Sequence, residues 1–363
     1  MRLRRTTPGK GGYRRKGRGR GFTYHRADGT TLTDLAELAR IKALAVPPAW
    51  KDVWVSDDPR GHLQAVGTDA AGRRQYRYHD VWRAKRDAAK FDHVLEVGAR
   101  LPAIRDRVAA DLRGRGLGRE KVLAAAVRLL DVGRFRIGGE AYAAGEAGTF
   151  GLATLLREHV TLPRGAVRFR YPAKGGIERS VDVTDADIRA VVKKLMERER
   201  ECEWQREWQR EWQRECQREC QRECQREWQR ECQRECEPDD GGLLAYRDGR
   251  RWVGVRSGDI NDYLRDIGRT EISAKDFRTW HGTVLAARLL AREPKVTGRT
   301  VPRVMRKVSE FLGNTPAVAR ASYVDPRVVD LYGDGITIPE RAASDQALGE
   351  VAVLRLLADE SGR

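Results

Sequence analysis

The sequence predicts an α+β protein in which a small, strand-rich N-terminal domain precedes a larger, mainly α-helical domain. Three observations support this prediction. Between residues 22 and 78, short segments rich in aromatic and β-branched residues alternate with Gly, Pro and Asp, as in strands joined by turns. From about residue 86 onward, apolar residues recur with helical spacing. With 363 residues, the chain is long enough to bury two separate hydrophobic cores.

We expect the domains to follow one another along the chain with few interruptions. A basic flexible tail over residues 1–21 precedes the strand-rich domain of residues 22–85, which has strands in WKDVWVS and GHLQAVGTD. The helical domain spans residues 86–345 and is interrupted by a repeat over residues 201–237. Residues 346–363 form a C-terminal helix or tail.

Several segments of the helical domain predict particular elements. Residues 98–112 and 119–132 have the apolar spacing of helices, and we expect another helix over residues 150–160. VRFRYPAKGGIERSVDV, residues 167–183, predicts two strands joined by a tight turn whose glycines supply positive φ. Lys174 lies in that turn, where it is exposed and free to reach a ligand.

Capping residues mark the start of two further helices. Ser273 and Asp276 have the spacing of a capping box and begin the helix of AKDFRTWHGTVLAARLL. Thr315 is a suitable N-cap and Pro316 suits the first helical position, so a short helix follows and ends near Tyr323.

The charge of the chain indicates a polyanionic partner. Lys and Arg total 70 against 53 Asp and Glu, a formal net charge of +17, and residues 1–26 contain no acidic residue. Nucleic acid is the first candidate partner and an anionic membrane the second. No apolar run approaches the about 18 residues of a spanning helix, and the basic N-terminus lacks the apolar core of a signal peptide. We therefore expect a cytoplasmic protein that binds a nucleic acid and no membrane.

The repeat of residues 201–237 consists of a four-residue unit, Trp/Cys-Gln-Arg-Glu, and contains all six cysteines of the chain. Trp and Cys codons differ in their third base, so we attribute the repeat to slippage of a 12-nucleotide unit. If helical, it would form a projecting rod about 55 Å long, without one face that could be buried throughout. The segment holds 11 Glu and 8 Arg, a net charge of −3, so the other 326 residues carry +20.

Two alternative interpretations of the repeat are a metal site and a coiled coil. Cys216, Cys220 and Cys224 stand one helical turn apart, but structural zinc usually takes pairs of ligands from two separate segments. A coiled coil needs apolar spacing near 3.5 residues rather than 4. We expect neither a metal site nor a cofactor.

Nine segments of the chain resemble the type IB DNA topoisomerases of the bacterial and poxvirus-like kind. The resemblance runs from about Phe22 to Pro339 apart from the repeat. It implies a mainly helical catalytic domain of the type shared by these enzymes and the tyrosine recombinases. The matching segments are PPAWKDVW, GHLQAVGTD, RRQYRYH, KVLAAAVRLLD, FRIGGEAYA, GLATLLREHV, GDINDYLRDI, AKDFRTWHGTVLAA and LGNTPAVARASYVDP.

The resemblance implies catalytic roles for five residues. Tyr323 of ARASYVDP matches the tyrosine that attacks the DNA and forms a 3′-phosphotyrosyl intermediate. Arg136 and Arg278 match the two arginines that hold the scissile phosphate, a task for which the planar guanidinium fork is well suited. Lys174 matches the general acid for the 5′-hydroxyl, although this chain has AKGG in place of a GKSG-like turn. Asn314 stands where many relatives have histidine, and an amide can still donate a hydrogen bond to a phosphate oxygen.

Other residues are assigned by the same resemblance or remain open. Gln75, Tyr76 and Tyr78 of RRQYRYH match the segment through which the N-terminal domain contacts DNA. His281, next to Trp280, resembles a catalytic base, but the family pattern assigns it no role and we expect it to contribute to packing.

The family implies an ATP-independent, metal-independent DNA topoisomerase that acts as a monomer, clamps duplex DNA and relaxes supercoils of both signs. One alternative is a tyrosine recombinase-like strand transferase, which shares the catalytic domain and joins two duplexes. Another is a DNA-binding protein whose activity is impaired by the insert of residues 201–237.

Overall fold

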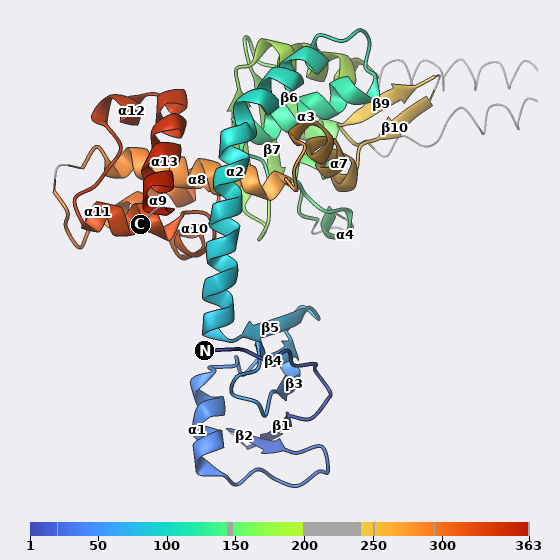
Figure 1. Ribbon diagram of the computed structural model, residues 1–363. Helices are drawn as coiled ribbons and strands as arrows, with labels where there is room; N and C mark the ends of the chain where they lie inside the picture. Colours follow the sequence, from blue (N-terminus) through green and yellow to red (C-terminus); the bar gives the residue numbers. More distant parts are fainter. Residues whose placement is uncertain (20, 144–147, 199–240, 250, 294, 362–363) are drawn as a thin grey trace, which may run out of the picture. The chain divides into compact units, whose positions relative to one another are not determined.

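The computed structural model describes the chain except for residues 20, 144–147, 199–240, 250, 294 and 362–363 (Figure 1). The chain divides into two compact units, Met1–His93 and Val94–Arg363, and the long helix α2 (Asp80–Leu112) contains the division. The first unit is built around an antiparallel sheet and the second is mostly helical, which confirms the predicted α+β class. The expected helical rod over residues 201–237 lies outside the described residues.

The N-terminal unit contains a five-stranded antiparallel sheet, the helix α1 and the first part of α2. The order of its strands is β2-β1-β3-β4-β5, so the first strand of the chain lies inside the sheet. Its elements are β1 (Tyr13–Arg18), β2 (Gly21–His25), α1 (Leu35–Ala43), β3 (Lys51–Val55), β4 (Leu63–Thr68) and β5 (Arg74–Tyr78).

One face of this sheet and α1 form a small core. Tyr13, Val55 and Ala65, which are paired across β1, β3 and β4, pack with Ile41 of α1. Since residues directly opposite in an antiparallel pair lie on the same face, this is the covered side of the sheet.

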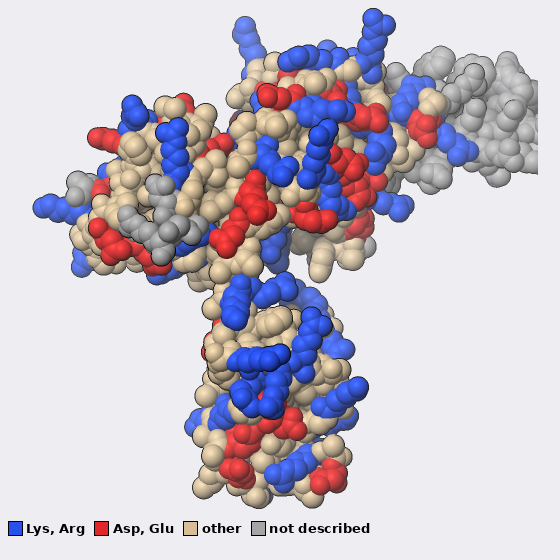
Figure 2. All heavy atoms as spheres, viewed as in Figure 1, with Lys and Arg blue, Asp and Glu red and all other residues tan. Residues whose placement is uncertain are grey.

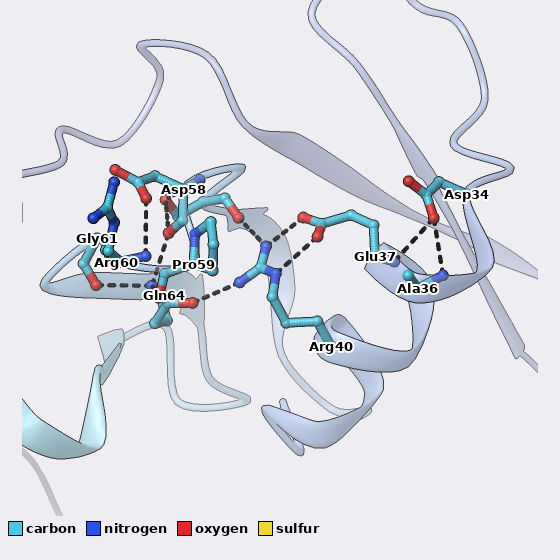
Figure 3. Close-up of polar contacts among 10 residues, drawn as sticks. Asp34, Ala36, Glu37, Arg40, Asp58, Pro59, Arg60, Gly61 and Gln64 are labelled. Carbon is cyan, nitrogen blue, oxygen red and sulfur yellow. Dashed lines mark hydrogen bonds and ion pairs between the residues drawn. The ribbon is translucent and has the colours of Figure 1, made fainter. Parts of the chain in front are cut away.

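A partly buried polar network links α1 to the loop between β3 and β4 (Figure 3). Arg40 donates to both carboxylate oxygens of Glu37, to the side chain of Gln64 at 2.6 Å and to the carbonyl of Ser56. Gln64 is buried and donates in turn to the carbonyl of Gly61 at 2.7 Å. The Arg40 guanidinium therefore links α1 to the β3–β4 loop and to the start of β4.

The N-terminal segment differs from the flexible tail that the sequence predicted for residues 1–21. β1 lies within that range and pairs with both β2 and β3, and Arg14 has a partner residue on each side. Tyr13 is buried in the sheet core, and this burial fixes the register of a strand that is otherwise basic.

The C-terminal unit surrounds one large core. Its helices are α3 (Arg119–Gly133), α4 (Glu140–Ala143), α7 (Ser257–Gly268), α8 (Ala274–Leu290), α9 (Thr300–Leu312), α10 (Pro316–Ser322), α11 (Pro326–Gly333), α12 (Glu340–Ser344) and α13 (Gln346–Ser361), and residues 186–198 are also helical. Its strands are β6 (Val160–Thr161), β7 (Val167–Pro172) and β8 (Glu178–Val183) in one sheet and β9 (Ala245–Asp248) and β10 (Arg251–Gly254) in another.

Helix α8 is the central element of this unit, and most of its residues are buried. Trp280 is fully buried, and α2 passes so close to it that a Cβ on Gly98 would lie 2.7 Å from the indole ring. The cap of α8 is as predicted, because the Asp276 carboxylate accepts hydrogen bonds from the N–H and the hydroxyl of Ser273. Because α8 is buried and capped in this way, it holds in place the side chains that it presents to α9 and α10.

The prediction of a helix over residues 150–160 is wrong. The segment contains two short 3-10 turns, η1 (Leu152–Thr154) and η2 (Arg157–His159), before β6. The N–H groups of Leu152 and Ala153 donate to the carbonyls of Arg136 and Ile137, at 2.8 and 2.7 Å. These long-range bonds hold the segment against the residues after α3 and replace the bonds of a continuous helix.

No helix in the described part of the chain is long and apolar enough to cross a membrane.

Candidate active site

The turn between α9 and α10 is the centre of the site. Helix α9 ends at Gly313, whose φ of 63° is in the left-handed region that favours glycine. Thr315 caps α10 by accepting a hydrogen bond from the N–H of Val318, and Pro316 occupies the first turn, as predicted. The sequence GNTP therefore fixes a sharp turn with Asn314 between the two helices.

Tyr323 follows α10 and is anchored to α8 through its main chain. Its N–H donates to the carbonyl of Ala319 at 2.9 Å, and its carbonyl accepts from the Thr283 hydroxyl at 3.4 Å. A Cβ on Gly282 would lie 2.5 Å from the Tyr323 carbonyl oxygen, so only glycine permits this approach. The phenol ring is partly buried and its position is set by two helices.

Arg278 lies beneath this tyrosine. It is 3% exposed, and its guanidinium carbon lies 5.2 Å from the centre of the Tyr323 ring. Its two terminal nitrogens donate to the carbonyl of Arg134, at 2.8 Å, and to the carbonyl of Leu312, at 2.6 Å. Arg278 thus joins the end of α9 to the segment after α3.

Arg136 reaches the same turn from that segment. Its Nη2 donates to the carbonyl of Gly313 at 2.7 Å. Four of the five predicted catalytic residues, namely Tyr323, Arg278, Arg136 and Asn314, are therefore gathered at or beside the α9–α10 turn.

The side chain of Asn314 has no hydrogen-bond partner among the described residues, although both its polar atoms are buried. An unpaired buried polar group costs about 1–3 kcal/mol, which is usually tolerated where a ligand completes the bonding. The amide is therefore available to bind an oxygen of a ligand.

Lys174 is at the tip of the β7–β8 hairpin and is exposed. Gly175 and Gly176 have φ values of 88° and 72°, which confirms the predicted use of the two glycines in this turn. The Lys174 side chain makes no hydrogen bond or ion pair with the described residues, so the structure does not bring it into contact with the other four.

Two more arginines, which the sequence analysis did not select, complete the cluster. Arg179 of β8 donates to the carbonyls of Leu312 and Arg134, both at 3.3 Å. Arg134 has a left-handed φ of 55°, and its guanidinium carbon lies 4.1 Å from the centre of the Phe311 ring. The only sequence signal for Arg179 was its position five residues after Lys174, and that position does not indicate which groups its guanidinium contacts.

These four arginines have no carboxylate partner within the described parts of the chain. Burial lowers the pKa of Arg278 to about 10, with repulsion from Arg136 and Arg179 adding to the effect and Tyr323 opposing it. Burial likewise lowers the pKa of Arg179 and of Arg134. Buried cations normally pair with anions, so the cluster is electrostatically prepared for an anionic ligand.

His281 takes part in a separate buried network. Its Nε2 donates to Asp131 at 2.9 Å, and Arg105 bridges Asp131 and Glu350 with contacts of 2.7 to 3.0 Å. These residues join α8, α3, α2 and α13, so His281 has a polar role in packing.

Gln75, Tyr76 and Tyr78 lie on β5 in the N-terminal unit. Tyr76 and Tyr78 are 47% and 39% exposed, and their rings are stacked with centres 6.1 Å apart. Gln75 donates to Asp69 at 2.9 Å. Two exposed, stacked aromatic rings are suited to contacts with nucleotides.

Among the residues that the structure describes, no group of three or more His, Cys, Asp or Glu residues could hold a metal ion. The six cysteines lie in a segment that the structure does not describe.

Comparison with known proteins shows what this chain is similar to. Residues 79–209 and 232–337 match the family described as eukaryotic DNA topoisomerase I, catalytic core. Residues 21–69 match the bacterial DNA topoisomerase IB N-terminal domain. DNA topoisomerase 1B of Acanthamoeba polyphaga mimivirus is 24% identical over 331 residues, covering 89% of this chain and 88% of that protein. The matched core, together with the cation cluster beside Tyr323, shows that this chain belongs to the type IB DNA topoisomerases, isomerases that bind DNA.

Proposed function

We propose that this protein relaxes positive and negative supercoils by transient cleavage of one DNA strand, with Tyr323 as the nucleophile and without ATP or metal. The observation that carries this proposal is the position of the Tyr323 ring over Arg278, beside Arg136 and the unpaired Asn314 amide. A nucleophile and donors for a phosphate are thereby held on one rigid turn.

The proposed chemistry uses these groups in two reversible steps. The Tyr323 phenol releases its proton to solvent as its oxygen attacks phosphorus, the bond to the 5′-oxygen breaks, and a 3′-phosphotyrosyl ester forms. Lys174 donates the proton that the 5′-oxygen needs as it leaves, and accepts it again on religation. Because the ester conserves the energy of the broken bond, strand rotation and resealing require no ATP.

Arg136 and Arg278 stabilise the negative charge that develops on the non-bridging oxygens, and Asn314 donates a further hydrogen bond. At present the two guanidinium groups are bonded to neutral main-chain carbonyls. Hydrogen bonds from a guanidinium to an anionic phosphate are roughly twice as strong as those between neutral groups, so DNA can compete for these donors.

On the face of the N-terminal sheet opposite α1, Trp54 and Val66 are buried, and the exposed side chains on either side of them supply a surface for duplex DNA. Arg14, Trp54, Val66 and Tyr76 are directly paired across β1, β3, β4 and β5, so they lie on the same face, away from the core with α1. Lys16 lies two residues along β1, on that same face. Figure 2 shows that Lys and Arg cover much of this unit in the view drawn. Basic residues for the backbone and stacked tyrosines for nucleotides are thus combined.

We further propose that the protein acts as a monomer on double-stranded DNA in the cytoplasm, in association with the nucleoid.

A plasmid assay tests the function. Negatively and positively supercoiled plasmids are incubated with the protein in EDTA and without ATP. We expect relaxation of both, and none with Tyr323→Phe. Relaxation that requires ATP or a divalent cation would contradict the proposal, and recombination between two defined sites would favour a strand transferase.

A further inference from the structure

Arg179 and Arg278 bind the same two main-chain oxygens. Each guanidinium donates one hydrogen bond to the carbonyl of Arg134 and one to the carbonyl of Leu312. The contacts of Arg278 are short, at 2.8 and 2.6 Å, whereas both contacts of Arg179 are 3.3 Å long. Because a carbonyl oxygen has two lone pairs, both arginines are accommodated, but they are like charges held side by side.

The surroundings of Arg179 fix its place. It is opposite Tyr171 in the β7–β8 pairing, and its Nη1 would lie 3.0 Å from a Cβ on Gly313. It therefore packs against the turn that carries Asn314. No carboxylate among the described residues pairs with it, and Arg136 repels it. An ordinary structural arginine in this position would be expected to have an acidic partner.

If the scissile phosphate takes donors from Arg278, as the proposed function requires, the two carbonyls lose their shorter hydrogen bonds. A buried carbonyl without a partner costs free energy, which would resist this transfer. Arg179 is already bonded to both oxygens and can shorten its contacts as Arg278 withdraws. Repulsion between the two guanidinium groups also favours that withdrawal.

We propose that Arg179 is a positioning residue for Arg278: it keeps both shared carbonyls bonded while Arg278 transfers its N–H donors to the scissile phosphate. The inference rests on the proposed function. It assigns Arg179 no contact with DNA. It also explains why Arg179, on the strand that follows Lys174, reaches the α9–α10 turn.

The test is a double-mutant cycle on the rate of covalent cleavage, measured in a single turnover on a duplex that cannot be religated. Arg179→Gln is expected to slow cleavage by about 10- to 100-fold, the size of effect that a misplaced catalytic group produces. The dissociation constant for DNA should change far less. In an Arg278→Lys background the same substitution should slow cleavage little further, because lysine has no fork to position.

Two variants complete the design. Arg170→Gln removes an exposed arginine of β7 that pairs with Glu178, and its cleavage rate should stay unchanged. Arg179→Lys retains the charge but cannot bridge both carbonyls, so it should show the same non-additivity if Arg179→Gln does not fold. Thermal unfolding of each variant identifies loss of fold.

Equal slowing in both backgrounds, weaker DNA binding at an unchanged cleavage rate, or no slowing at all would overturn the inference. These outcomes are separable from failure of the proposed function. If the parent protein forms no covalent adduct, or Tyr323→Phe forms as much, then the proposed function itself is wrong, whatever Arg179 does.

Discussion

The side chains around Tyr323 are held by hydrogen bonds that a ligand can replace. Arg136, Arg179 and Arg278 donate to carbonyls at the end of α9, where the helix dipole places partial negative charge. A phosphate would bring a full negative charge to the same donors. The site is thus kept assembled without DNA, at the cost of placing like charges together.

The role of Lys174 can be tested by changing the leaving group. Lys174→Ala should slow cleavage of ordinary DNA by about 10²- to 10⁴-fold, the usual contribution of a general acid. With sulfur in place of the bridging 5′-oxygen, the leaving thiolate needs no proton, so the variant should cleave almost as fast as the parent. Single-turnover rates on both substrates provide the measurement.

An equal loss on the oxygen and the sulfur substrate would exclude Lys174 as the general acid. The hairpin control is Arg170→Gln, which should cleave both substrates at the parental rate.

The Asp131 network predicts how stability depends on pH. Burial alone would raise the pKa of Asp131, but hydrogen bonds from His281 and Arg105 outweigh it and hold the pKa below its ordinary value. A carboxyl with a depressed pKa in the folded state stabilises the fold above its unfolded pKa, near 4, and this stabilisation is lost as the pH falls further. Asp131→Asn should lower the free energy of unfolding at pH 7 by about 3 kcal/mol.

Urea unfolding at pH 7 and pH 3 measures the effect. The destabilisation of Asp131→Asn relative to the parent should be smaller at pH 3 than at pH 7. Asp106→Asn, at an exposed position of α2, serves as the control and should follow the parent at both pH values. A deficit for Asp131→Asn that is equally large at both would show that the carboxylate charge contributes nothing.

At the scale of elements, local patterns predicted those structures that local interactions determine. The β7–β8 turn has the expected glycines at positive φ, and α8 begins at the expected Ser273–Asp276 cap. The helix expected over residues 150–160 failed because N–H groups of η1 bond to residues after α3, and no local pattern encodes such partners. The flexible tail expected over residues 1–21 failed for a similar reason. The burial of Tyr13 in the sheet core stabilises β1 although most of its other residues are basic.

The candidate site, too, was predicted only in part. Family resemblance selected the residues now found at the α9–α10 turn, whereas Arg179 was missed because its partners are main-chain oxygens far along the chain. Every residue has a main-chain carbonyl, so the type of the accepting residue does not reveal such a hydrogen bond.

Strand β1 makes a prediction of its own about DNA binding. Lys16 is exposed on the face of the sheet opposite α1, and Lys42 is exposed on α1 itself. Lys16→Gln should make the plot of log affinity against log salt concentration less steep by about 0.9, the effect of one lost phosphate contact.

Lys42→Gln removes the same charge from the covered side and should leave the slope unchanged. Equal changes for the two variants would mean that only the total charge matters and that β1 makes no specific contact.

For the molecule as a whole, the insert and the site are separate in the sequence. The match to the topoisomerase core stops at residue 209 and resumes at residue 232, within the repeat. The five proposed catalytic residues all lie outside it. The repeat carries a charge of −3 and the rest of the chain +20, so the DNA-binding charge does not depend on it.

Deletion of residues 201–237 should therefore leave plasmid relaxation unchanged, with DNA binding as tight or tighter. Relaxation is measured as the rate of conversion of supercoiled plasmid at several protein concentrations. A full-length protein without activity, rescued by the deletion, would show that the insert blocks catalysis.

The central claim is that Tyr323 becomes covalently joined to DNA. The most direct measurement mixes the protein with end-labelled DNA, stops the reaction with detergent and locates the labelled peptide. The account predicts that the 3′ end of the nicked strand is attached to Tyr323, that Tyr323→Phe yields no adduct, and that Tyr142→Phe, at an exposed position, yields as much as the parent. An adduct at another residue, on a 5′ end, or undiminished in Tyr323→Phe would contradict it.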